Sequence, residues 1–191
     1  MKIIDQRYLE SDNRYSTQPC LLSILELDPV TPEDTEKLQE RLYNTLPGLR
    51  RLRGLVGKRA DTVPPIVELV QQTAIELRRL ALNEVTVGFV GVVPRMQGRY
   101  RLVLPYSAAS AAAPSLALAT QLINAMLAGR SYNVKAGLAR LRALVDRRRK
   151  PRGHLMQTAR TILMSVMPRR TFSMPSIFSV SMPSSKAAAS S

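Results

Sequence analysis

The chain has 191 residues, about one domain on length alone, and carries 28 Lys and Arg against 14 Asp and Glu, which gives a net charge of +14. The charge is unevenly distributed, because residues 1–46 hold nine acids and five bases whereas residues 47–191 hold five acids and 23 bases. This imbalance favours anionic partners or a basic tail. An aromatic content of 5% without Trp disfavours single-strand binding by base stacking.

The single Cys and single His exclude several kinds of site. One thiol and one imidazole cannot form an internal disulfide, a multi-thiolate zinc site or a multi-histidine metal site. Cys20 lies in an apolar run and is predicted to be a buried small hydrophobe, and His154 is predicted to lie in a solvated linker. We therefore expect no metal and no cofactor.

Two further patterns bear on location. An acid as early as Asp5 argues against a signal peptide, so we expect a cytoplasmic protein. The apolar stretch 108–129 contains Pro114, Gln121 and Asn124, which favour a packed helix over a membrane span. No membrane partner is expected.

The first half of the chain predicts two strands and a helix. Residues 2–9 and 20–27 are β-type runs separated by a polar turn. Thr31 is a suitable N-cap for a helix that ends at Pro47-Gly48, and the Gly- and Arg-rich segment 49–62 is predicted to be a loop.

The second half predicts a helix, a hairpin and two more helices. The helix covers 64–82, the hairpin strands cover 85–93 and 99–106, and the last helices cover 114–127 and 134–148. The order β-β-α-β-β-α-α indicates an α+β fold, a single domain with a mixed or antiparallel sheet packed with helices.

The C-terminal part has the composition of a tail. From Arg147 onward there are nine bases and no acid, and from Pro168 the sequence is rich in Met, Ser, Pro and Ala. Such a segment buries too little apolar area to offset its ordering entropy. We therefore expect a folded domain at 1–146 and a disordered basic tail at 147–191.

Glycine-containing segments offer no nucleotide site. The segment Gly54-Leu55-Val56-Gly57-Lys58 lacks the first Gly of a phosphate loop and the Ser or Thr after the Lys. Gly88-Phe89-Val90-Gly91 lacks the strand-to-helix context of a dinucleotide loop.

An arginine-rich set is the candidate binding surface. Guanidinium groups pair with carboxylate or phosphate through two parallel hydrogen bonds, so arginines that converge would bind a polymeric or small anion. The alternative is a solvated basic face. The candidate residues are Arg50, Arg51, Arg53, Arg78, Arg79, Arg95, Arg99 and Arg101.

Four stretches of the sequence together indicate a family resemblance. They are Met1–Ile4 with Asn13-Arg14-Tyr15-Ser16, Leu46-Pro47-Gly48-Leu49, Ala74-Ile75-Glu76-Leu77 with Val85–Gly88, and Tyr100–Tyr106 followed by Leu122–Leu127. In their order and spacing, which matter more than any one stretch, residues 1 to about 145 resemble the N-terminal domain of cyanophycin synthetase, the bacterial ligase that polymerises Asp and Arg.

The resemblance implies binding without catalysis. Some family members carry a His-x-x-Glu-His pattern associated with metal-dependent cleavage of the polymer, and the matching positions here are Glu68, Gln71 and Gln72. Amides are poor zinc ligands and poor general bases. The ligase chemistry belongs to ATP-grasp and Mur-ligase-like domains, which nothing after Asp146 could encode. We therefore expect no enzyme activity and a module that binds an Asp/Arg polymer or docks onto a synthetase or ligase.

Three other interpretations stay open. A basic nucleic-acid-associated protein would use the segment 147–170 for nonspecific, salt-sensitive binding. Residual hydrolase activity would release dipeptide from the polymer. The chain could also be a truncated, non-functional remnant of a synthetase.

Overall fold

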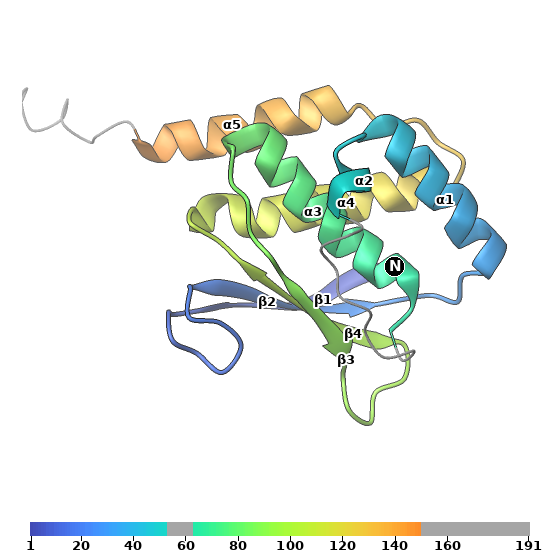
Figure 1. The fold of residues 1–191 in the computed structure, drawn as a ribbon, viewed down its shortest axis with the longest axis horizontal. Coiled ribbons are helices and arrows are strands. Elements are labelled where there is room, and N and C mark those ends of the chain that lie inside the picture. Colours follow the sequence, from blue (N-terminus) through green and yellow to red (C-terminus); the bar gives the residue numbers. More distant parts are fainter. Residues whose placement is uncertain (53–62, 150–191) are drawn as a thin grey trace, which may run out of the picture. The chain divides into compact units, whose positions relative to one another are not determined.

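The predicted strands pair into one antiparallel sheet with the spatial order β1-β2-β4-β3 (Figure 1). Its strands are β1 (Lys2–Leu9), β2 (Cys20–Glu26), β3 (Phe89–Val92) and β4 (Arg99–Pro105). The computed structural model describes residues 1–52 and 63–149, and Met1–Lys150 forms one compact unit. The α+β class is confirmed, with an antiparallel rather than a mixed sheet.

Helices cover one face of this sheet. They are α1 (Pro32–Thr45), α2 (Leu49–Leu52), α3 (Pro65–Leu82), α4 (Ala109–Leu127) and α5 (Val134–Arg149). In the described part, α4 contacts β1, α3 contacts β3 and β4, and α5 packs on both α3 and α4. Figure 1 shows α3 and α4 between the sheet and α5. The opposite sheet face, called the outer face below, points away from the helices.

Local chemistry explains where α1 and α3 begin. The Thr31 side chain accepts a hydrogen bond from the Asp34 amide at 3.1 Å, and Pro32 occupies the first helical position. Pro65 plays the same part in α3, which ends at Asn83 in the left-handed conformation (φ 55°). Both starts follow the sequence prediction.

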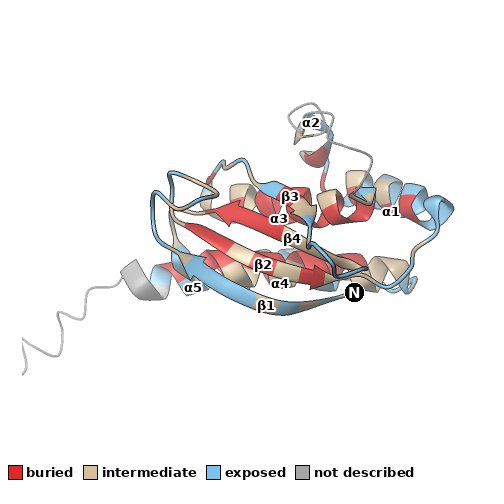
Figure 2. Cartoon of the chain, turned by 90° about the horizontal axis from the view of Figure 1, so that it is seen from below, coloured by how far each residue is buried: buried red, intermediate tan, exposed pale blue. Residues whose placement is uncertain are grey.

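The core lies between the sheet and the helices. Leu25 of β2 and Leu102 of β4 belong to one buried apolar cluster with Leu42, Leu77 and Leu116 of the helices. Figure 2 shows buried segments on both the sheet and the helices. Cross-strand partners share a face of a sheet, so the register Ile24↔Arg101 places both side chains on the outer face.

Three helical boundaries differ from the prediction. The segment predicted as a loop begins with the short helix α2, because Leu49 is fully buried in the core. Helix α4 begins at Ala109 and continues through Pro114, since Ala111 and Ala112 are also buried. Helix α5 continues to Arg149, so the first residues assigned to the tail are helical.

Strand β3 is shorter than predicted. The β-branched segment 85–88 runs toward β3 but is not part of the sheet. The Arg78 guanidinium bonds both to Thr86 on this segment and to the Pro105 carbonyl at the end of β4. Hydrogen bonds from a side chain therefore join the two segments where the strand ladder stops.

Two other expectations lie outside the description. The tail prediction for 150–191 and the loop prediction for 53–62 concern residues that the structure does not describe. Within the ranges it does describe, no helix combines the length and the apolar character needed to cross a bilayer.

Candidate functional site

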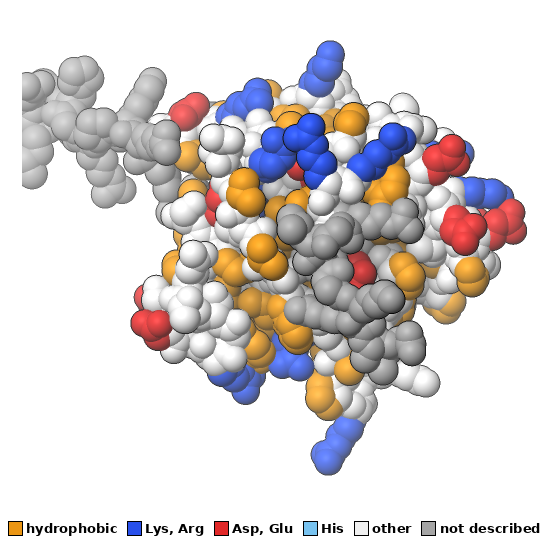
Figure 3. Space-filling model, in the orientation of Figure 1, with side chains coloured by type: hydrophobic (Ala, Val, Ile, Leu, Met, Phe, Trp, Pro, Cys, Tyr) orange, Lys and Arg blue, Asp and Glu red, His pale blue; other side chains and the backbone are white. Residues whose placement is uncertain are grey.

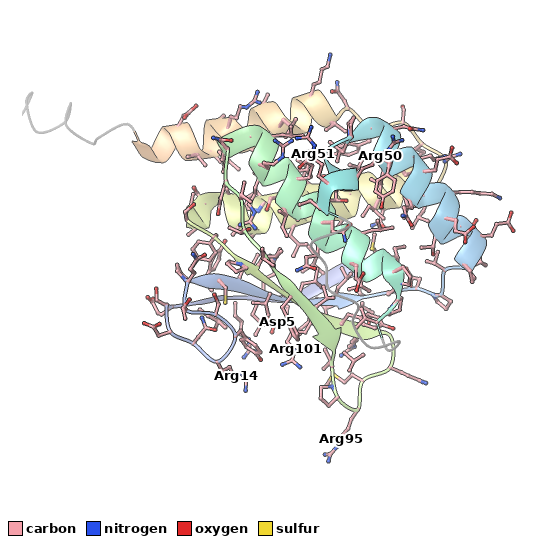
Figure 4. All side chains as sticks on the ribbon, in the orientation of Figure 1. Asp5, Arg14, Arg50, Arg51, Arg95 and Arg101 are labelled. Atoms are coloured by element: carbon pink, nitrogen blue, oxygen red, sulfur yellow. The ribbon has the colours of Figure 1, made fainter. Side chains whose placement is uncertain are left out.

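The predicted arginines do not converge on one surface. Figure 4 shows Arg50 and Arg51 beside the helices, whereas Arg95 and Arg101 lie at the sheet side of the molecule. Arg53 falls outside the described residues. The condition that these arginines converge is therefore not met by the described residues, because the helical layer separates α2 from the outer sheet face (Figure 4).

Arg78 is a structural residue and not a surface ligand. Its side chain is 0% exposed, and its NH1 nitrogen donates to the Pro105 carbonyl at 2.6 Å and to Glu84 Oε1 at 3.3 Å. Its NH2 nitrogen donates to Thr86 Oγ1 at 2.8 Å. Burial lowers the pKa of Arg78, and the charge of Glu84 opposes that shift. This guanidinium is inaccessible to a polymer.

Arg79 is largely compensated by its own helix. Its Nε and NH2 nitrogens donate to the two oxygens of Glu76 at 2.7 Å each, and Glu76 is 1% exposed. These contacts raise the pKa of Arg79. Among the candidate arginines that lie on the helices, Arg50 and Arg51 are thus the exposed ones without a carboxylate partner in the described part of the chain. Figure 3 shows basic side chains on the surface formed by the helices.

Arg99 belongs to a charge row on the outer face. The Glu26 carboxylate lies between Arg99 at 3.0 Å and Lys2 at 3.2 Å, on three neighbouring strands. Hydrogen bonds from Lys2 and Arg99 lower the pKa of Glu26. Arg95 lies in the turn between β3 and β4, is exposed and has a positive φ of 62°.

The lowered pKa of Glu26 predicts a pH-dependent contribution to stability. A carboxyl whose pKa falls on folding stabilises the protein above its ordinary value of 4.5, and this contribution is lost as pH falls through the folded-state pKa. We expect Glu26→Gln to be less stable than wild type at pH 7 and the difference to shrink below pH 4.5. Urea unfolding at a series of pH values measures this difference. A constant difference between pH 7 and pH 3 would contradict the assignment.

Arg101 forms the centre of a cationic cluster. Its NH1 nitrogen donates to the Tyr15 hydroxyl at 2.8 Å, and its guanidinium carbon lies 5.4 Å from the centroid of that ring. The Arg14 guanidinium lies 4.7 Å from the same centroid. No carboxylate of a described residue is within ion-pair distance of Arg14 or Arg101, and the buried Arg101 Nε has no partner there. Two like charges thus meet on one ring, and no carboxylate from ranges 1–52 and 63–149 pairs with either of them.

The loop between β1 and β2 brings Arg14 and Tyr15 to this position. The Asn13 side chain accepts hydrogen bonds from the Tyr15 and Ser16 amides, which fixes a tight turn. The Asn13 amide group also lies 3.4 Å from the buried Cys20 thiol, so the loop folds back onto β2. Cys20 is a buried small side chain, as predicted.

Acidic groups lie beside this cluster. Asp5 faces Ile24, which faces Arg101, so these residues share a row across three strands of the outer face. Asp5 pairs with Arg7 at 3.0 Å and keeps 44% of its side chain exposed. Figure 4 shows Asp5, Arg14 and Arg101 together below the sheet. We call this surface the charged face; it comprises Lys2, Asp5, Arg7, Arg14, Tyr15, Glu26, Arg99 and Arg101.

The sequence prediction found Arg99 and Arg101 but missed their neighbours. Arg14 and Tyr15 are in a stretch quoted for the family resemblance, yet that stretch gives no sign of contact with residue 101. Asp5 and Arg7 alternate along β1, a pattern that places both side chains on one face. This alternation was the sequence signal that could have placed Asp5 and Arg7 on the charged face.

The degenerate metal positions lie on α3. Gln71 and Gln72 are 3% and 6% exposed, and Glu68 is half-buried. Gly88 lies so close to the Gln71 amide group that an added Cβ would overlap its Nε2 atom. Over 1–52 and 63–149, no three His, Cys, Asp or Glu residues are placed to share a metal ion.

A cavity of about 610 Å³ lies elsewhere, between the β2–α1 connection, the start of α3 and the base of the β3–β4 hairpin. Val30, Ile66 and Tyr100 form apolar walls, and Glu36 and Asp28 border it. The Met1 ammonium group bonds to Asp28 at 2.8 Å and lowers the pKa of that carboxyl. Among the described residues that line this cavity there is none of the predicted arginines.

The functional assignment of this chain rests on its own residues. The chain matches no protein-family model, and no curated protein matches it. The class that the structure defines is an α+β domain with helices on one face of its sheet and a charged face on the other.

Proposed function

We propose that this chain is a noncatalytic module, similar to the N-terminal domain of cyanophycin synthetase, that binds a polymer of Asp and Arg through its charged face. The same face would serve for docking onto a synthetase or ligase that carries the polymer. The observation that carries the proposal is a cationic cluster, Arg14 with Arg101, that no described carboxylate compensates, together with the half-exposed carboxylates Asp5 and Glu26 on the same sheet face.

The chemistry of the polymer suits this arrangement. A chain of Asp and Arg presents carboxylates and guanidinium groups at short, regular intervals. Its carboxylates would bind at Arg14 and Arg101, and its guanidinium groups would bind at Asp5 and Glu26. Tyr15 would hold both arginine side chains in place, since its ring contacts both guanidinium groups.

Cosedimentation of the full chain with insoluble polymer tests the proposal. We expect wild type to be retained and the double reversal Arg14→Glu/Arg101→Glu to bind at least about tenfold more weakly, because hydrogen bonds to charged groups contribute about 1.5–3 kcal/mol each. The matched control is Arg50→Glu/Arg51→Glu, which makes the same change in net charge on exposed α2 positions. We expect this control to retain most of the binding.

Three outcomes would contradict the proposal. Retention no greater than that of lysozyme, a basic protein of unrelated fold, would exclude polymer binding. Equal loss in both double variants would show attraction by net charge without a defined face. Release of dipeptide by the purified chain would show a hydrolase instead of a noncatalytic module.

A further inference from the structure

We propose that two copies of this chain associate through their β1 strands, which pair antiparallel about a two-fold axis at Gln6. The pairing joins the two four-stranded sheets into one continuous sheet. This inference concerns the edge of the sheet and does not depend on polymer binding.

The outer edge of β1 is open within the described part of the chain. In that part β1 pairs only with β2, and Figure 2 shows it as a largely exposed strand at the sheet edge. Gln6, Arg7 and Tyr8 are consecutive exposed residues on it. An unpaired edge presents backbone donors and acceptors to another strand.

Symmetry restricts how β1 can pair with itself. Facing residues in an antiparallel pair point to the same side of the sheet. A two-fold axis perpendicular to the sheet must therefore lie midway between one residue and the same residue of the other copy. An axis at Asp5 or Arg7 places like charges opposite each other. An axis at Gln6 places Asp5 of each copy opposite Arg7 of the other.

The bulge in β1 limits the self-pairing segment. The pairing with β2 shifts between Ile3 and Asp5 and gives Ile4 no partner on β2, so Ile4 is the extra residue of the bulge. The regular self-pairing segment therefore begins at Asp5 and contains the two charged residues and Gln6.

The neighbouring helix does not oppose this association. Helix α4 lies along β1, because the Tyr8 hydroxyl bonds to the Ala109 carbonyl and Asn124 bonds to the Met1 carbonyl. Its sequence contains no charged residue. Bringing two copies together at β1 therefore brings no like charges together on α4.

The four side chains at the axis would form an ion-pair network. Asp5 and Arg7 already pair within one copy at 3.0 Å, on the outer face. In the pair of chains each Asp5 gains a second arginine and each Arg7 a second carboxylate. The short pairing segment and the high net charge of +14 predict a weak dimer that forms at high protein concentration.

Charge reversal tests the register. Sedimentation velocity of the full chain over a concentration series measures the dimer dissociation constant, at low ionic strength. Asp5→Arg and Arg7→Asp should each raise it at least about tenfold, because each change creates two repulsive pairs about the axis. The combined Asp5→Arg/Arg7→Asp variant restores both attractive pairs and should return to within about threefold of wild type.

The net charge of the variants distinguishes this register from general repulsion. Asp5→Arg raises the net charge and Arg7→Asp lowers it. If net charge alone controlled association, Asp5→Arg would raise the dimer dissociation constant and Arg7→Asp would lower it. Arg50→Asp changes the charge as Arg7→Asp does, on α2 and away from β1, and should not weaken the dimer.

A cross-link provides a second measurement that does not rely on charge. Gln6→Cys places one thiol opposite its own copy at the axis, whereas Gln97→Cys places it in the exposed turn of the hairpin. The native Cys20 is 0% exposed and should not react. We expect mild oxidation to link Gln6→Cys at least about tenfold faster than Gln97→Cys.

Each of three results would overturn the proposal. The first is a wild-type chain that stays monomeric at the highest concentration, together with equal cross-linking rates for the two cysteine variants. The second is a single charge reversal that leaves the dimer dissociation constant unchanged. The third is a combined reversal that fails to restore the wild-type dissociation constant.

Discussion

Replacing Arg78 by Met is expected to lower the free energy of unfolding by about 3–5 kcal/mol, the usual cost of removing one partner of a buried ion pair. The side chain of Arg78 is 0% exposed and that of Glu84 is 7% exposed. Without the guanidinium, the Glu84 carboxylate loses its only cationic partner among the described residues. The Thr86 hydroxyl and the Pro105 carbonyl lose a donor at the same time.

Urea unfolding at pH 7 measures this loss. Arg50→Met is the matched control, because Arg50 is exposed and its side chain makes a single long contact with the described residues, 3.5 Å to Asn44. Its effect should stay within about 0.5 kcal/mol.

A double-mutant cycle separates the ion pair from packing. Arg78→Met/Glu84→Met removes both charges and should be more stable than Arg78→Met alone, because no unpaired carboxylate stays buried. A loss of less than about 1 kcal/mol in Arg78→Met would show that Arg78 does not hold the strand ends together.

Replacing Gly48 by Ala is expected to lower the free energy of unfolding by about 1–3 kcal/mol, the range seen when a closely packed position is overfilled. A Cβ at Gly48 would overlap the Glu76 carboxylate. That carboxylate is 1% exposed and is held by two 2.7 Å hydrogen bonds from Arg79, so it cannot move aside without breaking them.

The control for this prediction is Gly91→Ala on β3. There the nearest atoms to an added Cβ are ring atoms of Phe89 at 3.3 Å, a contact that a small shift relieves. We expect a change within about 0.5 kcal/mol in Gly91→Ala. The destabilisation by Gly48→Ala should also be smaller in a Glu76→Ala background, and equal losses in both backgrounds would contradict the proposed overlap.

Arg78 and Glu76 show that α3 makes polar structural contacts in addition to burying an apolar face. Arg78 joins α3 to the segment before β3 and to the end of β4, whereas Glu76 pairs with Arg79 on the same helix and lies against Gly48, just before α2. Neither arginine is therefore available in the way that a basic surface requires. The residues that we retain as candidates for ligand binding are therefore Arg99 and Arg101 with their neighbours on the outer sheet face.

The candidate site could be predicted only in part. Arg99 and Arg101 follow from the hairpin pattern, which is local and places alternate residues on one face. The contact between Tyr15 and Arg101 joins residues 86 positions apart, and nothing in the neighbourhood of either residue indicates it. The contact requires both the β2–β4 register, which places Arg101, and the β1–β2 loop that folds back and brings Tyr15 to it.

The sequence by itself determined the α+β class, the strands 2–9 and 20–27, the cap of α1 at Thr31 and the position of the β3–β4 hairpin. These features depend on periodicity, turn residues and capping, which act over a few neighbouring residues. The tertiary structure alone decided that Arg78 is buried and that α2 and the sheet expose separate sets of arginines. It also decided that Arg14 and Arg101 contact the same ring, that of Tyr15. Those outcomes depend on strand order and helix packing, because contacts between distant residues are formed by the whole fold and not by local pattern.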